Sequence, residues 1–404
     1  MKESLKEIQT TAFDYSLPDD RIAKYPLHER DQSKLLVYNN KNIQQDSFCN
    51  LAEYLPRNSH IILNNTRVIH ARLIFRKTSG SKIEVFLIEP HAPQDYVVSF
   101  SKTRSVIWKC IIGNLKKWKD DTLEIRIPSL DTSLKAVKKS ATNVEVVVEF
   151  QWDKDLSFAQ VVELCGEVPL PPYLNRAPEK NDSITYQTVY ANKNGSVAAP
   201  TAGLHFTQRV FDSLSKKNID TSYITLHVGA GTFKPVKTNL AIEHEMHAEH
   251  FFVDLKVLKR LYMQKGNRIV VGTTTLRTLE SIYWLGVKAL RNELNESNFI
   301  SQWEVYNLSD EIEVNVALEA LISHMVCKKS EVLEAQTQLM ILPGYKIRMA
   351  NSLITNYHQP KSTLLFLVAA FMGEEWKKAY SYALENGFRF LSYGDSMLII
   401  NDLK

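Results

Sequence analysis

Residues 268–276 read RIVVGTTTL, an apolar strand that passes through a glycine into a run of threonines. The residues that follow place Leu276, Leu279 and Tyr283 at spacings of three and four, which puts them on one face of a helix. A second unit of this kind occupies residues 353–363, where a short apolar strand runs through a polar loop into an apolar helix. Strands that alternate with helices predict an α/β core.

A different periodicity occupies residues 68–165. Several segments there alternate apolar and polar residues, with turn-forming stretches between them and no helical pattern. Examples are KIEVFL (82–87), TLEIRI (122–127) and VEVVVE (144–149). The predicted fold is therefore a layered α/β catalytic domain, formed by residues 1–67 and 166–404, with an inserted antiparallel β-barrel domain over residues 68–165.

Composition excludes few function classes. Of 404 residues, 44% are hydrophobic and 23% charged, and the formal net charge is +4. The first thirty residues show no signal-peptide pattern, and no apolar run approaches the ~18 residues that a membrane helix needs. We therefore expect a cytoplasmic protein with no membrane partner. The four cysteines form no CxxC pair, and the small positive charge permits an RNA partner without requiring one.

Polar residues are dense at three strand exits. These are APTAGLHF (199–206), GTTT (272–275) and NYHQPKST (356–363). Two of them open a helix, and the free N–H groups of a helix start bind carboxylates or phosphates. Because such exits gather at one edge of an open α/β sheet, we expect one cavity shared by His205, His227, Thr274 and His358. Helix capping alone is the competing interpretation for each serine and threonine.

Two further features have competing interpretations. The segment EHEMHAEH (243–250) is rich in histidine but lacks the i, i+4 pair of a zinc-binding helix, so we expect no metal there. Gly229 and Gly231 follow a predicted strand and would let the backbone approach a ligand closely, although a simple tight turn explains them equally well.

A basic stretch with tryptophans lies in the predicted barrel. Its expected RNA-binding residues are Lys102, Arg104, Lys116, Lys117 and Lys119. The cations would contact phosphates, and exposed Trp108 and Trp118 would stack on unpaired bases. The same pattern also fits a solvated strand face whose tryptophans point into the core.

Taken together, several segments resemble the S-adenosylmethionine:tRNA ribosyltransferase-isomerase family of queuosine biosynthesis. They include NNTRVIHAR (64–72), PLPPY (169–173), GSVAAPTAGLHFT (195–207), GTTTLRTLES (272–281) and LITNYHQPKSTLL (353–365). The resemblance spans nearly the whole chain and implies an α/β domain with an inserted β-barrel. It also implies two substrates: S-adenosylmethionine, which is consumed and is not a cofactor, and tRNA with an aminomethyl-deazaguanine at the wobble position of its anticodon loop.

The implied reaction moves the ribosyl group onto that amine and rearranges it, giving epoxyqueuosine with release of methionine and adenine. It needs a base for a proton beside the sulfonium and an acid for the departing adenine. The catalytic candidates, with base and acid unassigned, are His205, His227, His244, His247, Glu249, His358 and Asp395. The substrate-binding candidates are Arg67, Tyr186, Thr201, Gly203, Phe206, Gly229, Gly231, Thr273, Thr274, Arg277, Asn356, Ser362 and Thr363.

Some of these candidates have specific implied roles. Thr273, Thr274 and Arg277 would bind the methionine carboxylate or a tRNA phosphate. Tyr186 and Phe206 would stack on adenine or on the target base. We expect the protein to be a monomer.

The chain departs from the family pattern at a few places. Asn65 and Asn351 stand where the family usually has aspartate, His70 stands where it has proline, and residues 285–338 form a longer segment than the pattern contains. These departures are compatible with a relative that acts on another acceptor. The sequence is also compatible with a non-catalytic RNA-binding protein and with a metallohydrolase built on the histidine cluster.

Overall fold

Four parallel strands form the centre of the larger sheet in this computed structural model. They are ordered β13 (Asp220–Leu226), β3 (His60–Asn64), β15 (Arg268–Val271) and β18 (Ser352–Asn356). Every residue of β3 and β18 is buried, as expected for parallel strands covered on both faces. The structure describes residue 5 and residues 7–77, 79–119, 121–142, 145–229, 236–264, 266–294, 298–308 and 312–401.

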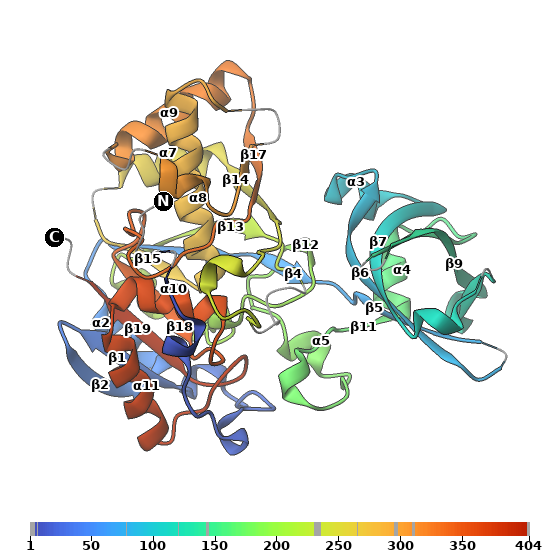
Figure 1. Cartoon of the computed structure of the whole chain (residues 1–404), viewed down its shortest axis with the longest axis horizontal. Helices are drawn as coiled ribbons and strands as arrows, with labels where there is room; N and C mark the ends of the chain where they lie inside the picture. The colour runs from blue at the N-terminus through green and yellow to red at the C-terminus, as the bar shows by residue number, and fades with distance from the viewer. Residues whose placement is uncertain are drawn as a thin grey trace.

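Helices cover both faces of this sheet (Figure 1). Ile62, Val270 and Leu353 point to one face and join the larger core. The helices on that face are α7 (Leu255–Met263), α8 (Thr273–Leu290), α9 (Val314–Cys327), α10 (Thr363–Met372) and α11 (Glu375–Glu385). This arrangement confirms the predicted layered α/β core.

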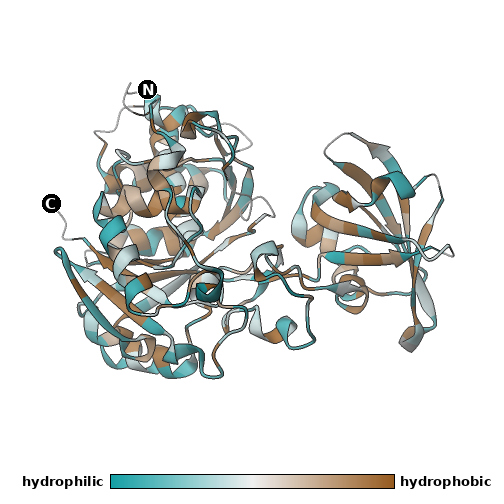
Figure 2. Cartoon of the chain, turned by 60° about the horizontal axis from the view of Figure 1, so that its bottom comes forward, coloured by the Kyte–Doolittle hydropathy of each residue, from teal (hydrophilic) through white to brown (hydrophobic). Residues whose placement is uncertain are grey.

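The opposite face has its own core. Ile61 and Ile269, one residue away from Ile62 and Val270, pack there against α6 (Gln208–Lys216) and α2 (Leu51–Tyr54). Successive side chains of a strand point to opposite faces, so one apolar run supplies both cores. Figure 2 shows hydrophobic residues on the inner strands and helices. In the part of the chain that is described, no helix is long and apolar enough to cross a membrane.

Six further strands extend the sheet on both sides to the order β16-β17-β14-β13-β3-β15-β18-β19-β1-β2. They are β1 (Lys34–Asn39), β2 (Asn42–Ser47), β14 (Glu249–Asp254), β16 (Phe299–Ile300), β17 (Val332–Thr337) and β19 (Ser396–Ile400). The long segment at 285–338 supplies β16, β17 and α9, so its described part widens the sheet and covers α8.

Gly286 lies where α8 crosses α9. A Cβ atom at this position would stand 2.2 Å from the carbonyl oxygen of Ala317 and 2.6 Å from its carbonyl carbon. In an open helix, alanine is more stable than glycine by roughly 0.5–1 kcal/mol. Here the backbone of α9 must move instead, so we expect Gly286→Ala to lower the free energy of unfolding by about 1–3 kcal/mol, measured by urea denaturation. A stabilised variant would contradict this close helix crossing.

Residues 72–167 form a second, seven-stranded antiparallel sheet in the order β11-β5-β6-β7-β10-β9-β8. The strands are β5 (Arg72–Arg76), β6 (Lys82–Ala92), β7 (Ser105–Gly113), β8 (Leu123–Ile127), β9 (Thr132–Ala141), β10 (Val146–Gln151) and β11 (Gly166–Glu167). Its inner side chains form a separate core with α3 (Tyr96–Ser101) and α4 (Phe158–Cys165).

The second sheet curls without closing. Cα atoms of β5 and β8 come within 8 Å of each other, yet no ladder joins these strands in the described residues. The predicted antiparallel unit is therefore confirmed as a curled half-barrel, while the closed barrel is not formed by backbone pairing. We call it the curled sheet. Figure 1 shows it beside the main unit, connected through β4 (Thr66–Val68), β11 and the segment that carries α5 (Asp182–Thr185).

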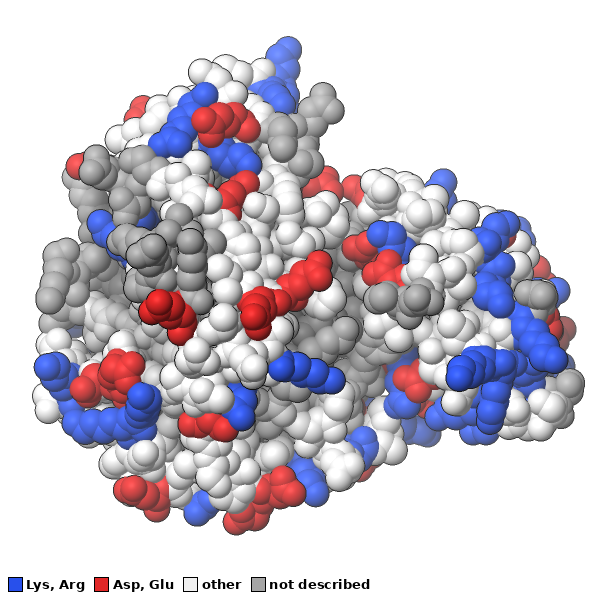
Figure 3. Space-filling model, in the orientation of Figure 1, with Lys and Arg blue, Asp and Glu red and all other residues white. Residues whose placement is uncertain are grey.

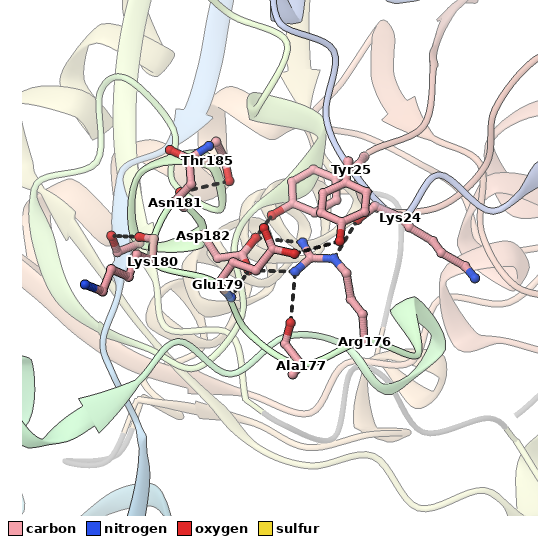
Figure 4. A network of polar contacts seen from close by, with 11 residues as sticks. Lys24, Tyr25, Arg176, Ala177, Glu179, Lys180, Asn181, Asp182 and Thr185 are labelled. Carbon is pink, nitrogen blue, oxygen red and sulfur yellow. Dashed lines mark hydrogen bonds and ion pairs between the residues drawn. The ribbon is translucent and has the colours of Figure 1, made fainter.

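A buried ion pair fixes the returning connection (Figure 4). The Arg176 guanidinium donates to both carboxylate oxygens of Asp182 at 2.7 Å and lies over the ring of Tyr25, 4.3 Å from its centroid. Tyr393 donates a third hydrogen bond to Asp182 at 3.2 Å. Burial opposes the charge, but these bonds hold the pKa of Asp182 below its usual value. The connection is thereby attached to the N-terminal segment and to the loop that contains Ser392.

Candidate functional site

The three polar strand exits meet at one cavity, at the carboxyl edge of the parallel strands. Its lining includes residues 198–202, 272–274 and 355–359, together with Ser362 and Ser392. The cavity holds about 730 Å³ of empty space, including the part open to solvent. The predicted convergence is therefore confirmed for Thr201, Thr273, Thr274, Asn356, His358 and Ser362, which all line the cavity.

The start of α8 faces this cavity without a side-chain cap. Gly272 joins β15 to α8 at φ +91°, a conformation open to glycine, and no side chain caps the helix. The amides of the first turn, from Thr273 to Thr275, therefore have no acceptor within the helix. With the positive end of the helix dipole, they form a site suited to a carboxylate or phosphate.

The start of α10 differs from that of α8. The hydroxyl of Ser362 accepts from the amide of Leu365 at 3.2 Å and caps the helix. Thr363 is the first residue of α10 and is not among the residues that line the cavity. Capping therefore explains Ser362, whereas it does not explain Thr273 and Thr274.

His358 presents a neutral imidazole to the cavity. Its Nε2 lies 2.9 Å from Thr355 Oγ1, and the Thr355 hydroxyl donates its own proton to the Asn356 carbonyl at 3.2 Å. Thr355 therefore accepts from Nε2–H, which leaves the lone pair on Nδ1. Burial lowers the pKa of His358 to about 3, so the ring is unprotonated at neutral pH. Tyr15 and Tyr380 fix its backbone by hydrogen bonds to the carbonyl and the amide.

His205 does not line this cavity, so the predicted shared cavity is wrong for it; it is buried behind Asn356, which does line the cavity. Asn356 donates its amide protons to the carbonyls of Leu391 and Ser392, so its Oδ1 must accept from His205 Nε2 at 3.0 Å. Burial lowers the pKa of His205 to about 4, and the neutral ring uses Nδ1 to accept from Ser33 at 2.8 Å. Both ring nitrogens are therefore occupied, and the geometry suits positioning of Asn356 better than proton transfer.

His227 faces a different cavity, between the main and curled sheets, so the predicted shared cavity is wrong for this residue. Its Nδ1 lies 2.9 Å from Thr66 Oγ1, and its ring packs 4.7 Å from that of Tyr96 on α3. Burial lowers the pKa of His227 to about 3. The next residue, Val228, lines the first cavity, because neighbouring side chains of an extended segment point to opposite sides.

Arg277 and Glu249 form a buried ion pair away from the cavity lining. Glu249 Oε1 also accepts the amide of Gly229 at 3.0 Å. Burial lowers the pKa of Arg277 to about 10, which still leaves the guanidinium charged at neutral pH. The pair connects α8 to the segment after β13, and Gly231 of that segment lies outside the described residues.

The remaining catalytic candidates do not line the cavity. His247 is exposed and His244 is half-buried, and no group of three or more His, Cys, Asp or Glu among the described residues could hold a metal. Asp395 accepts from Arg389 Nη2 at 2.9 Å, from the Arg389 amide at 2.8 Å and from the Lys34 amide at 3.1 Å. These bonds attach β19 to β1, which is a structural role.

Several substrate-binding candidates are corrected by their surroundings. Tyr186 and Phe206 are fully buried in two separate cores and lie outside the cavity lining, so the predicted stacking on a base is wrong for this arrangement. Gly203 serves close packing, because a Cβ there would lie 2.0 Å from the Tyr190 hydroxyl. Arg67 is exposed and pairs with Glu163 at 3.7 Å.

The basic stretch of the curled sheet is not one surface. Trp108 and Trp118 are 0% and 2% exposed, so the stacking role is wrong and the inward-facing interpretation is correct. Lys102 and Arg104 precede β7, whereas Lys116, Lys117 and Lys119 follow it. The two groups are therefore separated by the length of a nine-residue strand, roughly 30 Å at ~3.3 Å per residue.

At two of the positions where the chain departs from the family pattern, the side chain makes a structural contact. Asn351 Oδ1 accepts the amide of Arg268 at 2.8 Å, a role that an aspartate oxygen could also perform. His70 Nδ1 lies 3.1 Å from the carbonyl of Glu163, beside the curled sheet. Asn65 accepts from the Thr225 hydroxyl at 2.7 Å and lines the same cavity as His227.

Sequence reasoning missed five polar residues of the cavity: Tyr173, Thr355, Tyr357, Gln359 and Ser392. Thr355 sets the tautomer of His358, and Tyr173 and Ser392 form a 2.6 Å hydrogen bond across the cavity wall. Tyr173 belongs to the segment PLPPY, and Ser392 precedes a Tyr-Gly-Asp sequence near the C-terminus. Their place in such motifs was a signal, but only the folded chain shows which motif residues reach the cavity.

Comparison with known proteins finds relatives that match nearly the whole chain. Residues 10–399 match the family model described as "Queuosine biosynthesis protein". The chain is 36% identical over 395 residues to the S-adenosylmethionine:tRNA ribosyltransferase-isomerase of Sulfurihydrogenibium sp., covering 96% of this chain and 98% of that protein. It is 37% identical over 396 residues to the protein of the same name from Halothermothrix orenii, with the same shares covered.

A solved structure of an S-adenosylmethionine tRNA ribosyltransferase from Thermotoga maritima is 26% identical. The match covers 96% of this chain and 99% of that one, with a TM-score of 0.46. On the whole-length family match and the sequence identity to its relatives, the chain belongs to the queuosine biosynthesis protein family.

Proposed function

We propose that this protein transfers and isomerises the ribosyl moiety of S-adenosylmethionine onto the aminomethyl-deazaguanine wobble base of a tRNA anticodon loop. Epoxyqueuosine is the product, and methionine and adenine are released. One observation carries the proposal: the uncapped start of α8 and the neutral ring of His358 lie on the same cavity. The names of the relatives support the donor and the acceptor.

The cavity offers distinct surroundings for the two ends of the donor. The amides at the start of α8 suit the methionine carboxylate, because they are positive and unpaired. Ala198, Pro200, Val228 and Leu364 provide an apolar wall against which a nucleoside can pack. S-adenosylmethionine is consumed as a substrate, so the proposed reaction uses no separate cofactor.

His358 is the best candidate for the base. It is the one imidazole among the described lining residues, which include no carboxylate. The sulfonium acidifies the adjacent ribose carbon, and Nδ1 accepts the proton while the electron pair stays on that carbon. Burial makes an imidazolium unfavourable, and the negative charge that develops beside it offsets this cost.

A product assay tests the function. The protein is incubated with S-adenosylmethionine and tRNA that carries the precursor base, and the digested tRNA is examined by mass spectrometry. We expect epoxyqueuosine, with one adenine released per product formed. Adenine release without this nucleoside would favour a relative with another acceptor. Absence of both donor binding and adenine release would favour a non-catalytic RNA-binding protein.

A further inference from the structure

Six cations at one end of the curled sheet form a cluster that the cavity does not use. They come from residues 76–82, which include the turn between β5 and β6, and from residues 114–119, which follow β7. Every charged residue in these two segments is Lys or Arg. The cluster, called the basic end, consists of Arg76, Lys77, Lys82, Lys116, Lys117 and Lys119. Figure 3 shows Lys and Arg side chains gathered on this unit, towards its side away from the main unit.

Direct contacts hold the two segments of the basic end together. Lys77 Nζ donates to the Lys117 carbonyl at 3.1 Å, and Asn114 Nδ2 donates to the Lys82 carbonyl at the same distance. Behind them, the Trp118 ring is buried in the core of the curled sheet, and its Nε1 donates to the Asp121 carbonyl at 2.8 Å. The cations therefore stand on a fixed backbone, although they come from separate parts of the chain.

The basic end carries more positive than negative charge, because its six cations stand against two aspartates, Asp120 and Asp121, that follow Lys119 directly in the sequence. Lys77 pairs with Asp121 at 2.8 Å, and in the described part of the chain no ion pair joins the other five cations to a carboxylate. Glu84, two residues from Lys82, is bound by Arg72 at 2.7 Å. The other five cations are exposed.

The fold also contains a repulsion at the basic end. Arg76 and Lys82 are directly opposite partners in the ladder of β5 and β6, on its outer face. Like charges directly opposite each other destabilise an antiparallel pair. A polyanion bound over this end would relieve the repulsion and replace the missing carboxylates.

We propose that the basic end binds phosphates of the tRNA substrate outside the nucleotide that enters the cavity. The identity of this polyanion rests on the proposed function. None of the described residues that line the cavity comes from the curled sheet, so a ligand that contacts both must be large. Lysines predominate, and both tryptophans of the stretch are buried. The contact therefore uses the RNA backbone through charge, without stacking or sequence readout.

The test removes three of the exposed cations in a variant with Lys116→Gln, Lys117→Gln and Lys119→Gln. Each lost phosphate contact lowers the salt slope of log Kd for tRNA by about one unit. We therefore expect the slope to fall by about three units and tRNA affinity to fall at least roughly tenfold at low salt. KM for tRNA should rise in parallel, whereas kcat and KM for S-adenosylmethionine should stay within about twofold, because the cavity is unchanged.

A matched control removes the same charge elsewhere on the curled sheet and its adjoining loops. Arg126, Lys135 and Lys154 are exposed and lie outside the basic end, and all three are replaced by glutamine. This control should bind tRNA like the parent protein. Equal weakening in both variants, or an unchanged salt slope in the first, would overturn the proposal.

Two further outcomes separate competing explanations. Both proteins are tested with vesicles of phosphatidylcholine and phosphatidylserine. Vesicle binding that is lost in the basic-end variant while tRNA binding persists would assign the surface to a membrane and overturn the RNA proposal. Normal tRNA binding through the basic end without epoxyqueuosine would instead contradict the proposed function and leave this inference standing.

Discussion

Replacing His358 by alanine is expected to lower kcat about 1,000-fold, within the range that general-base residues contribute. The reason is the lone pair on Nδ1, which Thr355 keeps available by accepting the proton on Nε2. The affinity for S-adenosylmethionine should change only a few-fold, because the uncapped start of α8 remains. Single-turnover kinetics and calorimetric titration with the donor separate the two effects.

Thr355→Val tests the tautomer argument. Valine has the same shape but cannot accept from His358 Nε2–H, so the lone pair is no longer confined to Nδ1. We expect roughly a tenfold fall in kcat, smaller than the loss on removing the ring. An effect on donor affinity alone would show that Thr355 shapes the cavity and has no influence on the base.

His60→Gln is the matched control for His358→Ala. His60 is also buried with a pKa lowered to about 4, but it lies at the amino end of β3, on the opposite edge of the sheet from the cavity. This variant should lose stability and keep its turnover per folded molecule. If His358→Ala retained turnover within tenfold of the parent protein, His358 would not be the base.

Acid is expected to unfold this protein at a mild pH. Burial lowers the pKa values of several histidines from 6.5, and four of these values fall furthest: those of His60 and His205 to about 4, and those of His227 and His358 to about 3. In the unfolded chain each titrates near 6.5. Below that pH the unfolded state binds protons that the folded state does not, so the free energy of unfolding falls as the pH falls.

The size of this loss of stability follows from the difference in proton binding between the folded and unfolded states. The contribution of each histidine is complete above pH 6.5 and is lost towards its folded pKa, by about 1.4 kcal/mol per pH unit. At pH 5 the loss of stability is about 2 kcal/mol for each histidine. The combined loss of the four histidines is a large part of a typical stability of 5–15 kcal/mol. Urea denaturation at pH 7, 6 and 5 measures it. Carboxylates with lowered pKa values, such as Asp182, titrate below this window.

A single substitution checks the assignment to buried histidines. His60→Gln removes one of the four proton acceptors, so the change in unfolding free energy between pH 7 and pH 5 should shrink by about 2 kcal/mol. His247→Gln, at an exposed position, should leave that change as it is. Equal pH dependence in His60→Gln and the parent protein would contradict the assignment.

Local patterns in the sequence were sufficient for the fold class and for the cavity's location. The run RIVV can only be a buried strand or helix, Gly272 ends it at a positive φ, and threonines start the next helix. These patterns involve residues that are close together in the sequence, so they can be recognised without knowledge of the rest of the chain. They also predicted that three distant loops would meet, because parallel strands end at one edge of a sheet.

The tertiary structure alone decided which residues reach the cavity. Side-chain direction reverses at each residue of an extended segment, so Val228 enters the cavity while His227 faces another. The state of an imidazole depends on partners that the sequence places far away, as Asn356 is from His205. The balance of charge also depends on distant contacts. Arg277 pairs with Glu249, and cations from two separate strand ends lie together in the basic end. These are contacts between distant segments, and no local pattern encodes them.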